Sequence, residues 1–557
     1  MRLLHRIFNN TFLYIQTIKY LKFQQIFYRV INVVGYKKTK TILTHVSRNK
    51  PILSWVKSIR KSISTSDGLE FLFLNKKGNI RSKGDWNNAN FSKLWLYNLH
   101  YFDYINSSKN GSNNYEINII RTWMDENPPF NGVGWEPYTI SLRIVNWIKW
   151  LYENNYSDSE IEHSIFLQSR HLFNNIEYHI LGNHLISNAK ALIFSGLFFE
   201  GSEPKKWLLK GKLILKNELS EQILSDGGHY ERSPMYHAII LEDLLDIYNI
   251  LGYFKDSSKD MLTFFILKMF NWLNRMIHPD KNLSFFNDSV NGIASPIGEI
   301  MNYCKRLDIN LDTNSNNTIK NNSFNDLKDS GYVSYANKDI FIIIDRGNIG
   351  PDYLPGHAHA DTLSFELSIY KKRFIVNLGT STYENNSIRL QQRGTANHST
   401  LLINNKNSSN VWSSFRVAER AKIIKRSNVI NENSIILKGT HDGYSNLIGN
   451  PIHEREWHIF DNEIKITDNI IGKSKQNIKL VFPLHPHVKI MEINDNIVNC
   501  LINEKEVSII FPSHIGDIKL EECDYHPNFG VSIATLKIVY EVTGNIPIKI
   551  QTTISWQ

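Results

Sequence analysis

The stretch Thr313-Asn-Ser-Asn-Asn-Thr318 divides this sequence of 557 residues into two parts with different hydrophobic patterns. From about Phe91 to Cys304 the apolar residues recur at helical spacing, whereas after Gly331 they form short β-branched runs. A polar stretch between two such patterns is typical of a linker or an exposed loop. We therefore predict an α+β multidomain chain, with an all-helical domain followed by an antiparallel β domain.

The spacing of apolar residues also predicts the individual elements. Ile140-Ser-Leu-Arg-Ile-Val-Asn-Trp-Ile-Lys-Trp150 is typical of an amphipathic helix, and further helices are expected over 188–196 and 236–251. Short β-branched segments separated by Gly, Asn and Asp favour an antiparallel sheet sandwich. The predicted strands are 340–345, 374–377, 434–438, 463–467, 477–482 and 549–556. The predicted domain bounds are a helical extension over 1–60, the helical domain over 61–311, a linker over 312–330 and the β domain over 331–557.

The composition describes a globular protein with a basic excess. Hydrophobic residues make up 42% of the chain and charged residues 21%, which is ample material for a large core. The formal net charge of +9 favours an acidic partner, such as a polyanionic glycan, a nucleic acid or a membrane surface. We predict no nucleic-acid partner, because the sequence contains no RNA-binding signature, zinc finger or dense basic tract.

The N-terminus is basic, but it does not have the pattern of a targeting segment. Its apolar run from Ile7 to Ile15 is interrupted by polar residues, and no small-residue cleavage site follows. We predict neither a cleaved signal peptide nor a transmembrane helix, and we favour a cytoplasmic or cell-associated location over secretion. A basic amphipathic helix over Leu13–Val34 could touch a membrane, although we expect it to pack on the main domain.

Three polar stretches contain groups suited to proton transfer. Gly356-His-Ala-His-Ala-Asp361 would place two imidazoles on one face of an extended strand, and Ala396-Asn-His398 supplies a third. In the helical half, Asn183 and His184 precede an apolar helix, where Asn183 could serve a function or act only as the N-cap. Asp226-Gly-Gly-His-Tyr-Glu-Arg-Ser-Pro-Met-Tyr-His237 is unusually rich in hydrogen-bonding groups for a connecting loop.

An amide, a phenol and an imidazole together match the requirements of β-elimination from a uronic acid. The proton alpha to the carboxylate is only weakly acidic, so donors such as Asn183 must neutralise the carboxylate charge and stabilise the dianion that forms. A base then removes this proton, and an acid protonates the leaving glycosidic oxygen. Tyr236 and His357 could fill these two roles, and nearby cations could lower the pKa of the tyrosine from about 10.

These motifs together resemble the polysaccharide lyases of the heparinase II/III family. The resemblance rests on Gly182-Asn-His184, Ser233-Pro-Met-Tyr236, Gly356-His-Ala-His359 and Asn397-His398, and it extends from about Phe91 to the C-terminus. Two further stretches add to it, 135–146 (WEPYTISLRIVN) and 412–420 (WSSFRVAER). The resemblance implies an incomplete (α/α) toroid, an antiparallel β-sandwich and an active site in the groove between them. It also implies eliminative cleavage of an acidic, uronic-acid-containing polysaccharide.

The resemblance also implies roles for individual residues. Asn183, with His184 beside it, matches the position that neutralises the carboxylate. Tyr236 matches the base or acid tyrosine, and His357 matches the catalytic histidine. His359 and His398 match the ligands of a metal in the β domain.

The sequence departs from the family at this metal position. Asn377 stands where metal-binding relatives would place an aspartate. A neutral amide is a poor zinc ligand, so we predict no certain cofactor and treat a divalent metal, zinc or calcium, as an open alternative. His359 and His398 could instead form a hydrogen bond across strands.

Several aromatic and charged residues are candidates for binding the substrate. Aromatic rings can stack on sugars and basic groups can pair with carboxylates, although helix packing or a solvated face would explain the same residues. On the stretch 412–420, Arg416 and Arg420 would share one face of a strand. The substrate-binding candidates are Trp135, Glu136, Arg143, Tyr230, Glu231, Arg232, Arg393 and Arg416.

Two other functions remain open from the sequence. A glycoside hydrolase on the same toroid would use a carboxylate pair, such as Asp226 with Glu231 or Glu242. A non-catalytic glycan-binding protein of surface-polysaccharide biosynthesis could keep the groove without turnover, because a fold does not guarantee an activity.

Overall fold

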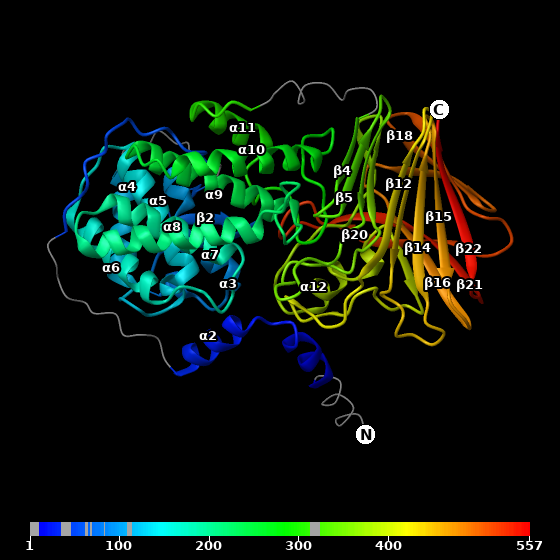
Figure 1. Ribbon diagram of the computed structural model, residues 1–557, viewed down its shortest axis with the longest axis horizontal. Coiled ribbons are helices and arrows are strands. Elements are labelled where there is room, and N and C mark those ends of the chain that lie inside the picture. Colours follow the sequence, from blue (N-terminus) through cyan, green and yellow to red (C-terminus); the bar gives the residue numbers. More distant parts are fainter. Residues whose placement is uncertain are drawn as a thin grey trace.

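The computed structural model describes residues 11–34, 46–61, 65–66, 69–82, 84–107, 114–311 and 323–557. Helices form one half of the molecule and antiparallel sheets the other, and the two halves lie side by side in Figure 1. An incomplete (α/α) toroid is therefore followed by a β-sandwich domain, which confirms the predicted fold class. Residues 312–322 of the predicted linker lie outside the described residues, and part of its remainder forms strand β4 (Ser323–Leu327).

The helices of the toroid begin and end largely where local sequence signals place them. Ser92, Asp158 and Ser233 each cap a helix by accepting hydrogen bonds from backbone N–H groups of its first turn. The three predicted helical stretches lie within α5, α7 and α9. The helices are α3 (Lys93–Tyr101), α4 (Asn114–Glu126), α5 (Pro137–Glu153), α6 (Ser159–Asn174), α7 (Asn183–Phe198), α8 (Ser202–Gln222), α9 (Pro234–Tyr253), α10 (Lys259–Arg275) and α11 (Ile297–Arg306). The shorter elements are β1 (Thr65–Ser66), β2 (Glu70–Phe73), β3 (Lys76–Asn79), η1 (Asp85–Asn87), η2 (Asp103–Asn106) and η3 (Val133–Trp135).

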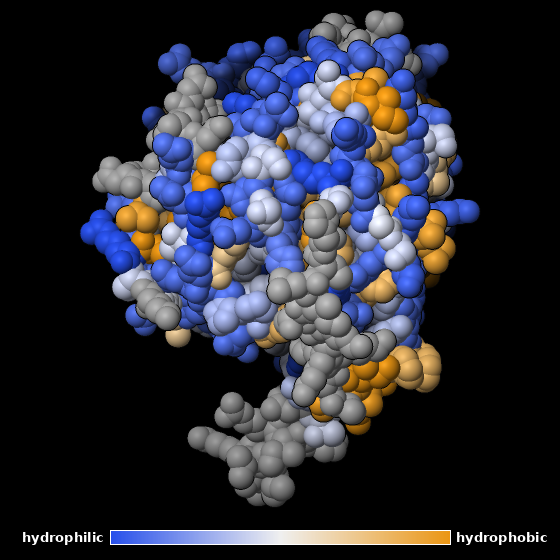
Figure 2. Space-filling view, turned by 90° about the vertical axis from the view of Figure 1, so that its left-hand side faces the viewer, coloured by the Kyte–Doolittle hydropathy of each residue, from blue (hydrophilic) through white to orange (hydrophobic). Residues whose placement is uncertain are grey.

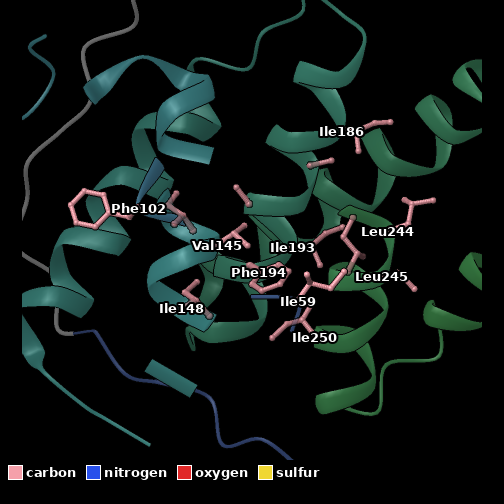
Figure 3. Packing of buried hydrophobic residues seen from close by; sticks show 14 of the residues in the cluster. Ile59, Phe102, Val145, Ile148, Ile186, Ile193, Phe194, Leu244, Leu245 and Ile250 are labelled. Carbon is pink, nitrogen blue, oxygen red and sulfur yellow. The ribbon is translucent and has the colours of Figure 1, made fainter. Parts of the chain in front are cut away.

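Helix α7 lies at the centre of the helical core. Every residue of α7 except His184 is buried, because the helix contacts α5, α8 and α9. Figure 3 shows Ile193 and Phe194 of α7 between Val145 of α5 and Leu245 of α9. Truncating such a buried side chain to alanine costs about 2–5 kcal/mol. The first residues of α7 are thereby held in a fixed place at the end of a rigid helix.

The β half contains three larger sheets whose ladder pairs are all antiparallel. Along β14 the burial alternates, with His453, Arg455 and Trp457 facing the core, as expected for a strand with one solvated face. The five-stranded sheet runs β4-β5 (Tyr332–Ala336)-β6 (Ile340–Asp345)-β7 (Phe365–Ile369)-β8 (Lys372–Ile375). The four-stranded sheet runs β20 (Asp517–Tyr525)-β21 (Ile533–Asn545)-β16 (Lys475–Pro483)-β9 (Leu401–Ile403). The eight-stranded sheet runs β12 (Ile423–Ile430)-β13 (Ile435–His441)-β14 (Ile452–Ile459)-β15 (Glu463–Ile471)-β22 (Ile548–Trp556)-β19 (Lys505–Ile510)-β18 (Ile497–Ile502)-β17 (Lys489–Asn494).

Two local predictions for the β half were wrong. The segment Gly356–Asp361 is not a strand but part of the loop between β6 and β7. The stretch around Trp412 is a tight hairpin of β10 (Val411–Trp412) and β11 (Arg416–Val417), which turns at Ser413 with φ 53°. Arg416 therefore faces Trp412 across the hairpin and does not share a strand face with Arg420.

The connection between α10 and α11 joins the two halves. Its residues leave the toroid and pack into the β domain, where His278 bonds the Glu366 carboxylate (Nε2–Oε2 2.8 Å) on β7. The backbone N–H of Phe285 donates to the same carboxylate. Further along, the backbone N–H of Asp288 donates to the carbonyl of His357 at 3.0 Å. This connection places an acidic side chain of the first half inside the second.

The N-terminal segment, residues 11–34, lies outside both domains and contacts each of them. Residues 11–18 are helical, and α2 (Phe23–Val34) follows. In Figure 1 this segment lies below the two domains, near the place where they meet. Within the described parts of the chain, no helix has the length and apolar character needed to cross a bilayer.

Candidate active site

Asp288 is a fully buried carboxylate that collects hydrogen bonds from three basic side chains. It lies 3.0 Å from Nδ1 of His357, 2.9 Å from Nε2 of His359 and 2.7 Å from one guanidinium nitrogen of Arg389. Burial alone would raise the pKa of Asp288, but the Arg389 charge and the imidazole hydrogen bonds hold it well below its usual range. The carboxylate is therefore ionised at neutral pH.

The ionised Asp288 fixes the orientation of His357. A carboxylate can only accept, so Nδ1 of His357 carries a proton in this hydrogen bond, and Nε2 is the nitrogen left to face other groups. The Nε2 atom lies 3.7 Å from Oε2 of Glu231, and the His357 side chain is 14% exposed. An imidazole held in one tautomer by a buried carboxylate, with its other nitrogen accessible, is suited to act as a base.

Tyr236 stacks directly on His357. The two rings are 3.7 Å apart between centroids and inclined by 26°. The phenol oxygen of Tyr236 lies 3.2 Å from that of Tyr383. Burial raises the pKa of Tyr236 well above its usual value, and the neighbouring Tyr383 raises it further. The prediction that cations lower this pKa is not supported, and the phenol is neutral and able to donate a proton.

The sequence Ser233-Pro-Met-Tyr236 explains why Tyr236 lies there. Ser233 is the N-cap of α9, and its Oγ accepts from the backbone N–H of Tyr236 at 3.2 Å. The same hydroxyl donates to the backbone carbonyl of Asp288 at 2.6 Å. Pro234 follows at the first helical position, where its missing N–H costs nothing. One capping serine thus links the start of α9 to the backbone that carries the buried carboxylate.

On the toroid side, the N-terminus of α7 points at Glu231. The N-cap of α7 is Gly182, with φ 60°, so the alternative that Asn183 is only an N-cap was wrong. The backbone N–H of Asn183 donates to the Glu231 carboxyl group. A Cβ added at Gly182 would lie 2.6 Å from a Leu354 methyl and 2.9 Å from Glu231 Oε1. Glycine is therefore required for this close approach.

Glu231 lies between the helix terminus and two imidazoles. It is buried, and among the residues that the structure describes its Oε1 has no hydrogen-bond partner. Burial raises the pKa of Glu231, while His357, the Asn183 N–H and His184 act in the opposite direction. Through Glu231, the structure brings Asn183, Tyr236 and His357 into one place.

His184 forms a second oriented imidazole, on the toroid side. Its Nδ1 donates to Glu177 Oε1 at 3.0 Å, and its ring packs on Tyr138 at 4.2 Å between centroids. Burial would raise the pKa of Glu177, but His184 and Asn188 lower it overall. Glu177 is thus an ionised partner that fixes the tautomer of His184.

Two of the arginines predicted to bind substrate lie inside the protein, which does not favour that role. Arg143 is fully buried, stacks on Trp123 at 3.8 Å and donates to Gln168. Arg393 is also fully buried and donates to the carbonyl of Ala358. The long side chains satisfy internal carbonyls and amides, so neither can reach a glycan. Arg393 instead supports the loop that carries His357.

The other substrate-binding candidates are dispersed. Trp135 is buried and lines a separate surface cavity of about 610 Å³ with Trp123 and Pro129. Arg232 donates to the backbone carbonyls of Asn348 and Asp329.

The remaining three candidates lie on the toroid and on the β10–β11 hairpin. Glu136 pairs with Lys93 at 2.9 Å and bonds the hydroxyl of Tyr97. Tyr230 is buried next to Glu231. Arg416 lies on the β10–β11 hairpin, over the rings of Tyr14 and Trp412.

The predicted metal residues do not provide a fitting ligand set. His359 Nδ1 lies 3.3 Å from His398 Nε2, and His398 Nδ1 lies 2.9 Å from Asn377 Oδ1. Asp288 is already bonded to His359 and Arg389. Among the residues described, no three His, Cys, Asp or Glu side chains are grouped to hold a metal ion. Two imidazoles and an amide lack the third strong donor that such a site requires.

Three residues that complete the site were missed from the sequence. Asp288 lies in a loop that gives no periodic signal, and it is recognisable only from its buried partners. Tyr383 has no motif around it. Glu177 lies seven residues before His184, beyond the reach of local spacing rules. Arg389 also contributes to the site, where it is fully buried and pairs with Asp288.

The carboxylate pair of a glycoside hydrolase does not form around Glu231. Asp226 accepts hydrogen bonds from the backbone N–H groups of Gly228, Asp329 and Ser330. Glu242 bonds the hydroxyl of Ser295 at 2.6 Å. Asp226, the carboxylate predicted to pair with Glu231 or Glu242, is therefore engaged by backbone N–H groups, and Glu242 is engaged by Ser295.

The chain matches known protein families and curated proteins. Residues 32–307 match the family model "Heparinase II/III N-terminus", and residues 319–557 match "Heparinase II/III-like, C-terminal". The "Heparin-sulfate lyase" of Bacteroides thetaiotaomicron is 25% identical over 415 residues, 66% of this chain and 57% of the relative. That of Bacteroides stercoris is 24% identical over 334 residues, 55% of this chain and 46% of the relative. The chain thus spans about half the length of these curated relatives.

Solved structures support the fold. "Crystal Structure of Heparinase III" superposes with a TM-score of 0.72 at 21% identity, covering 86% of this chain and 80% of the other. A chondroitin AC lyase of Streptomyces coelicolor, solved with chondroitin sulphate, superposes with a TM-score of 0.55 at 8% identity, covering 83% and 75%. At these identities the likeness concerns the fold alone.

Proposed function

Because the chain belongs to the heparinase II/III family, we propose that it is a polysaccharide lyase that cleaves a uronic-acid-containing acidic glycan by β-elimination. The observation that carries the proposal is the His357 imidazole, oriented by the buried Asp288 and stacked on the neutral phenol of Tyr236. Curated relatives named heparin-sulfate lyases support a glycosaminoglycan-like substrate.

In the proposed mechanism, the start of α7 and Glu231 receive the uronate carboxylate. The positive end of a helix favours an anion, and the Asn183 amide adds a hydrogen-bond donor. Burial raises the pKa of Glu231, which favours its neutral form, and the neutral form would be a hydrogen-bond donor to the substrate carboxylate. These donors interact more strongly with the dianion formed after deprotonation than with the substrate, so they lower the barrier.

His357 and Tyr236 then take opposite proton-transfer roles. The Nε2 lone pair of His357 removes the proton alpha to the carboxylate, and Asp288 stabilises the resulting imidazolium. The C–O bond to the leaving sugar breaks as the double bond forms, and the hydroxyl of Tyr236 protonates the leaving oxygen. The raised pKa of Tyr236 supports the role of acid, because a base would need the phenolate.

The proposal is tested by a screen of acidic polysaccharides, read by ultraviolet absorbance of the unsaturated uronide product. We expect at least one uronic-acid polymer to give this absorbance, and Tyr236→Phe to lower the rate by roughly 10²–10⁴-fold. Tyr540→Phe is the matched control, because its hydroxyl bonds the Pro512 carbonyl in the β domain, outside the site. New reducing ends without absorbance would instead identify a hydrolase, and binding without product would identify a glycan-binding protein.

A further inference from the structure

The positive charge of this chain is confined to its N-terminal part. Residues 1–66 contain 13 Lys and Arg and no Asp or Glu, while the whole chain has a net charge of +9. Residues 67–557 therefore contain 50 basic and 54 acidic residues and carry a net charge of −4. The basic excess is not a property of the two domains that form the candidate active site.

The N-terminal segment, residues 11–34, also has its amphipathic faces reversed. A surface helix normally turns its apolar stripe to the protein core. Within residues 23–33 of α2, Gln25 is buried, at 1% exposure, whereas Phe23 is 80% and Val33 88% exposed. The large apolar side chains exposed on the segment are Phe12, Tyr14, Ile15, Ile18, Phe23, Ile26, Phe27, Val30, Ile31 and Val33.

Polar and aromatic contacts hold the segment in this orientation. The side-chain amide of Gln25 donates to the carbonyl of Tyr353 at 3.2 Å, and Lys22 pairs with Glu221 on α8. Tyr28 packs on Tyr178 at 4.8 Å between centroids. The polar face is thus used for docking on the protein, and the apolar face is left outward.

The earlier helical residues are fixed to the β domain in the same way. The indole of Trp412 donates to the hydroxyl of Thr17 at 3.1 Å, and the Arg420 guanidinium lies 3.8 Å from the Tyr20 ring centroid. In Figure 2, apolar side chains gather at the lower edge of the molecule, where Figure 1 places α2. Apolar side chains are therefore exposed along the whole segment, from Phe12 to Val33.

We propose that residues 11–34 dock the protein on the surface of an anionic lipid bilayer. An amphipathic helix with a basic surround lies in the plane of such a surface, with its apolar side chains among the acyl chains. Each nearby Lys or Arg adds attraction to the anionic headgroups. The absence of any acidic residue from 1–66 removes the like-charge repulsion that this surface would otherwise exert.

Other occupants of this face fit the observations less well. A second copy docked face to face would bring two exclusively basic segments together, which is electrostatically unfavourable. An acidic polysaccharide would pair with the cations but would leave the Ile and Val side chains in water. An anionic bilayer would attract the basic side chains and would also remove the apolar side chains from water.

Docking by this segment would place the candidate site beside the bilayer. Tyr353, which contacts Lys22 and Gln25, precedes His357 by four residues. The neighbouring Leu354 approaches Gly182, at the start of α7. The segment is therefore attached to the same loop that carries the proposed base.

Co-sedimentation of the full chain with vesicles tests the proposal. One set of vesicles contains phosphatidylglycerol and phosphatidylcholine, and the other contains phosphatidylcholine alone. We expect binding to the anionic vesicles at least roughly tenfold stronger, and weakened by added salt. The triple variant Phe23→Glu, Phe27→Glu, Val30→Glu should lower it by roughly tenfold or more.

A matched control variant distinguishes the effect of losing the apolar face from the effect of adding negative charge. Leu209→Glu, Leu213→Glu, Ile448→Glu replaces three exposed aliphatic residues elsewhere and adds the same charge, so it should bind as the unmodified chain does. Thermal unfolding checks that both variants fold. Absent or unselective vesicle binding, or equal loss in both variants, would overturn the proposal. So would a triple variant that loses only self-association, or only binding to an acidic polysaccharide, while vesicle binding persists.

Discussion

Two histidine–aspartate clusters in the β half have the same composition but different surroundings. One joins His357, His359, Arg389 and Asp288; the other is the strand cluster, which joins His441, His453, Arg455 and Asp468. In the strand cluster all four side chains are buried on β13, β14 and β15.

The strand cluster is closed by its own hydrogen bonds. The Gly443 N–H donates to His441 Nδ1, His441 Nε2 donates to His453 Nδ1, and His453 Nε2 donates to Asp468. Each imidazole nitrogen therefore has a partner. In the other cluster, Nε2 of His357 is accessible and faces Glu231 at 3.7 Å. The two clusters therefore differ in one accessible imidazole nitrogen, and not in the types of residue present.

The largest expected difference is in turnover. His357→Ala should lower turnover by roughly 10²–10⁴-fold with little loss of stability, because Asp288 keeps Arg389 and His359 as partners. His453→Ala should cost about 1–3 kcal/mol of unfolding free energy and leave the turnover of the folded protein unchanged. Product absorbance and urea unfolding measure the two quantities. If His453→Ala abolished turnover as His357→Ala does, the two clusters would not differ in function.

A smaller effect is expected on stability when the strand-cluster carboxylate is removed. Asp468→Asn leaves the buried Arg455 guanidinium without its anion, which should cost about 3–5 kcal/mol of unfolding free energy. Denaturant unfolding of the variant and the unmodified chain measures this cost. A loss below about 1 kcal/mol would mean that the strand cluster is not a stabilising ion pair.

The pH dependence of stability should be common to both clusters. Burial would raise the pKa values of Asp288 and Asp468, but Arg389 and Arg455 lead the partners that lower them overall. Their contribution to stability is present above the unfolded pKa of about 3.9 and is lost as the pH falls through the folded pKa. Below about pH 4, Asp468→Asn should reduce the slope of unfolding free energy by up to about 1.4 kcal/mol per pH unit. An unchanged slope would show that Asp468 does not titrate with folding.

The smallest effect is expected from metal removal. A chelator should leave turnover and the thermal midpoint of the unmodified chain unchanged, because His359, His398 and Asn377 provide no third strong donor. Asn377→Asp supplies a carboxylate beside His398, and this variant should gain a zinc-dependent rise in the thermal midpoint. A chelator-sensitive unmodified chain would mean that the amide does not prevent metal binding.

The sequence predicted the elements better than it predicted the contacts. Apolar periodicity placed α5, α7, α9 and β6 correctly, because it reports directly on which face is buried. The His-x-His spacing in Gly356–Asp361 predicted a strand wrongly, because a loop there places both imidazoles on Asp288. Spacing was also a poor guide at Arg143, because it cannot distinguish a buried, internally bonded guanidinium from an exposed one.

The net charge of the whole chain was the least specific indication of a binding partner. The value of +9 was interpreted as favouring an acidic partner, yet all of the excess lies in residues 1–66. The candidate site itself contains the carboxyl groups of Glu177, Glu231 and Asp288 alongside its imidazoles. An average over the chain conceals this separation, whereas the distribution of charge along the sequence reveals it.

The assignment of base and acid is tested most directly by hydrogen exchange at the substrate. The glycan found in the screen is incubated in deuterated water with Tyr236→Phe or with His357→Ala, and deuterium alpha to the uronate carboxylate is measured by NMR in uncleaved polymer. We predict incorporation with Tyr236→Phe, which keeps the base but lacks the acid, and none with His357→Ala. Incorporation with His357→Ala and none with Tyr236→Phe would contradict the account.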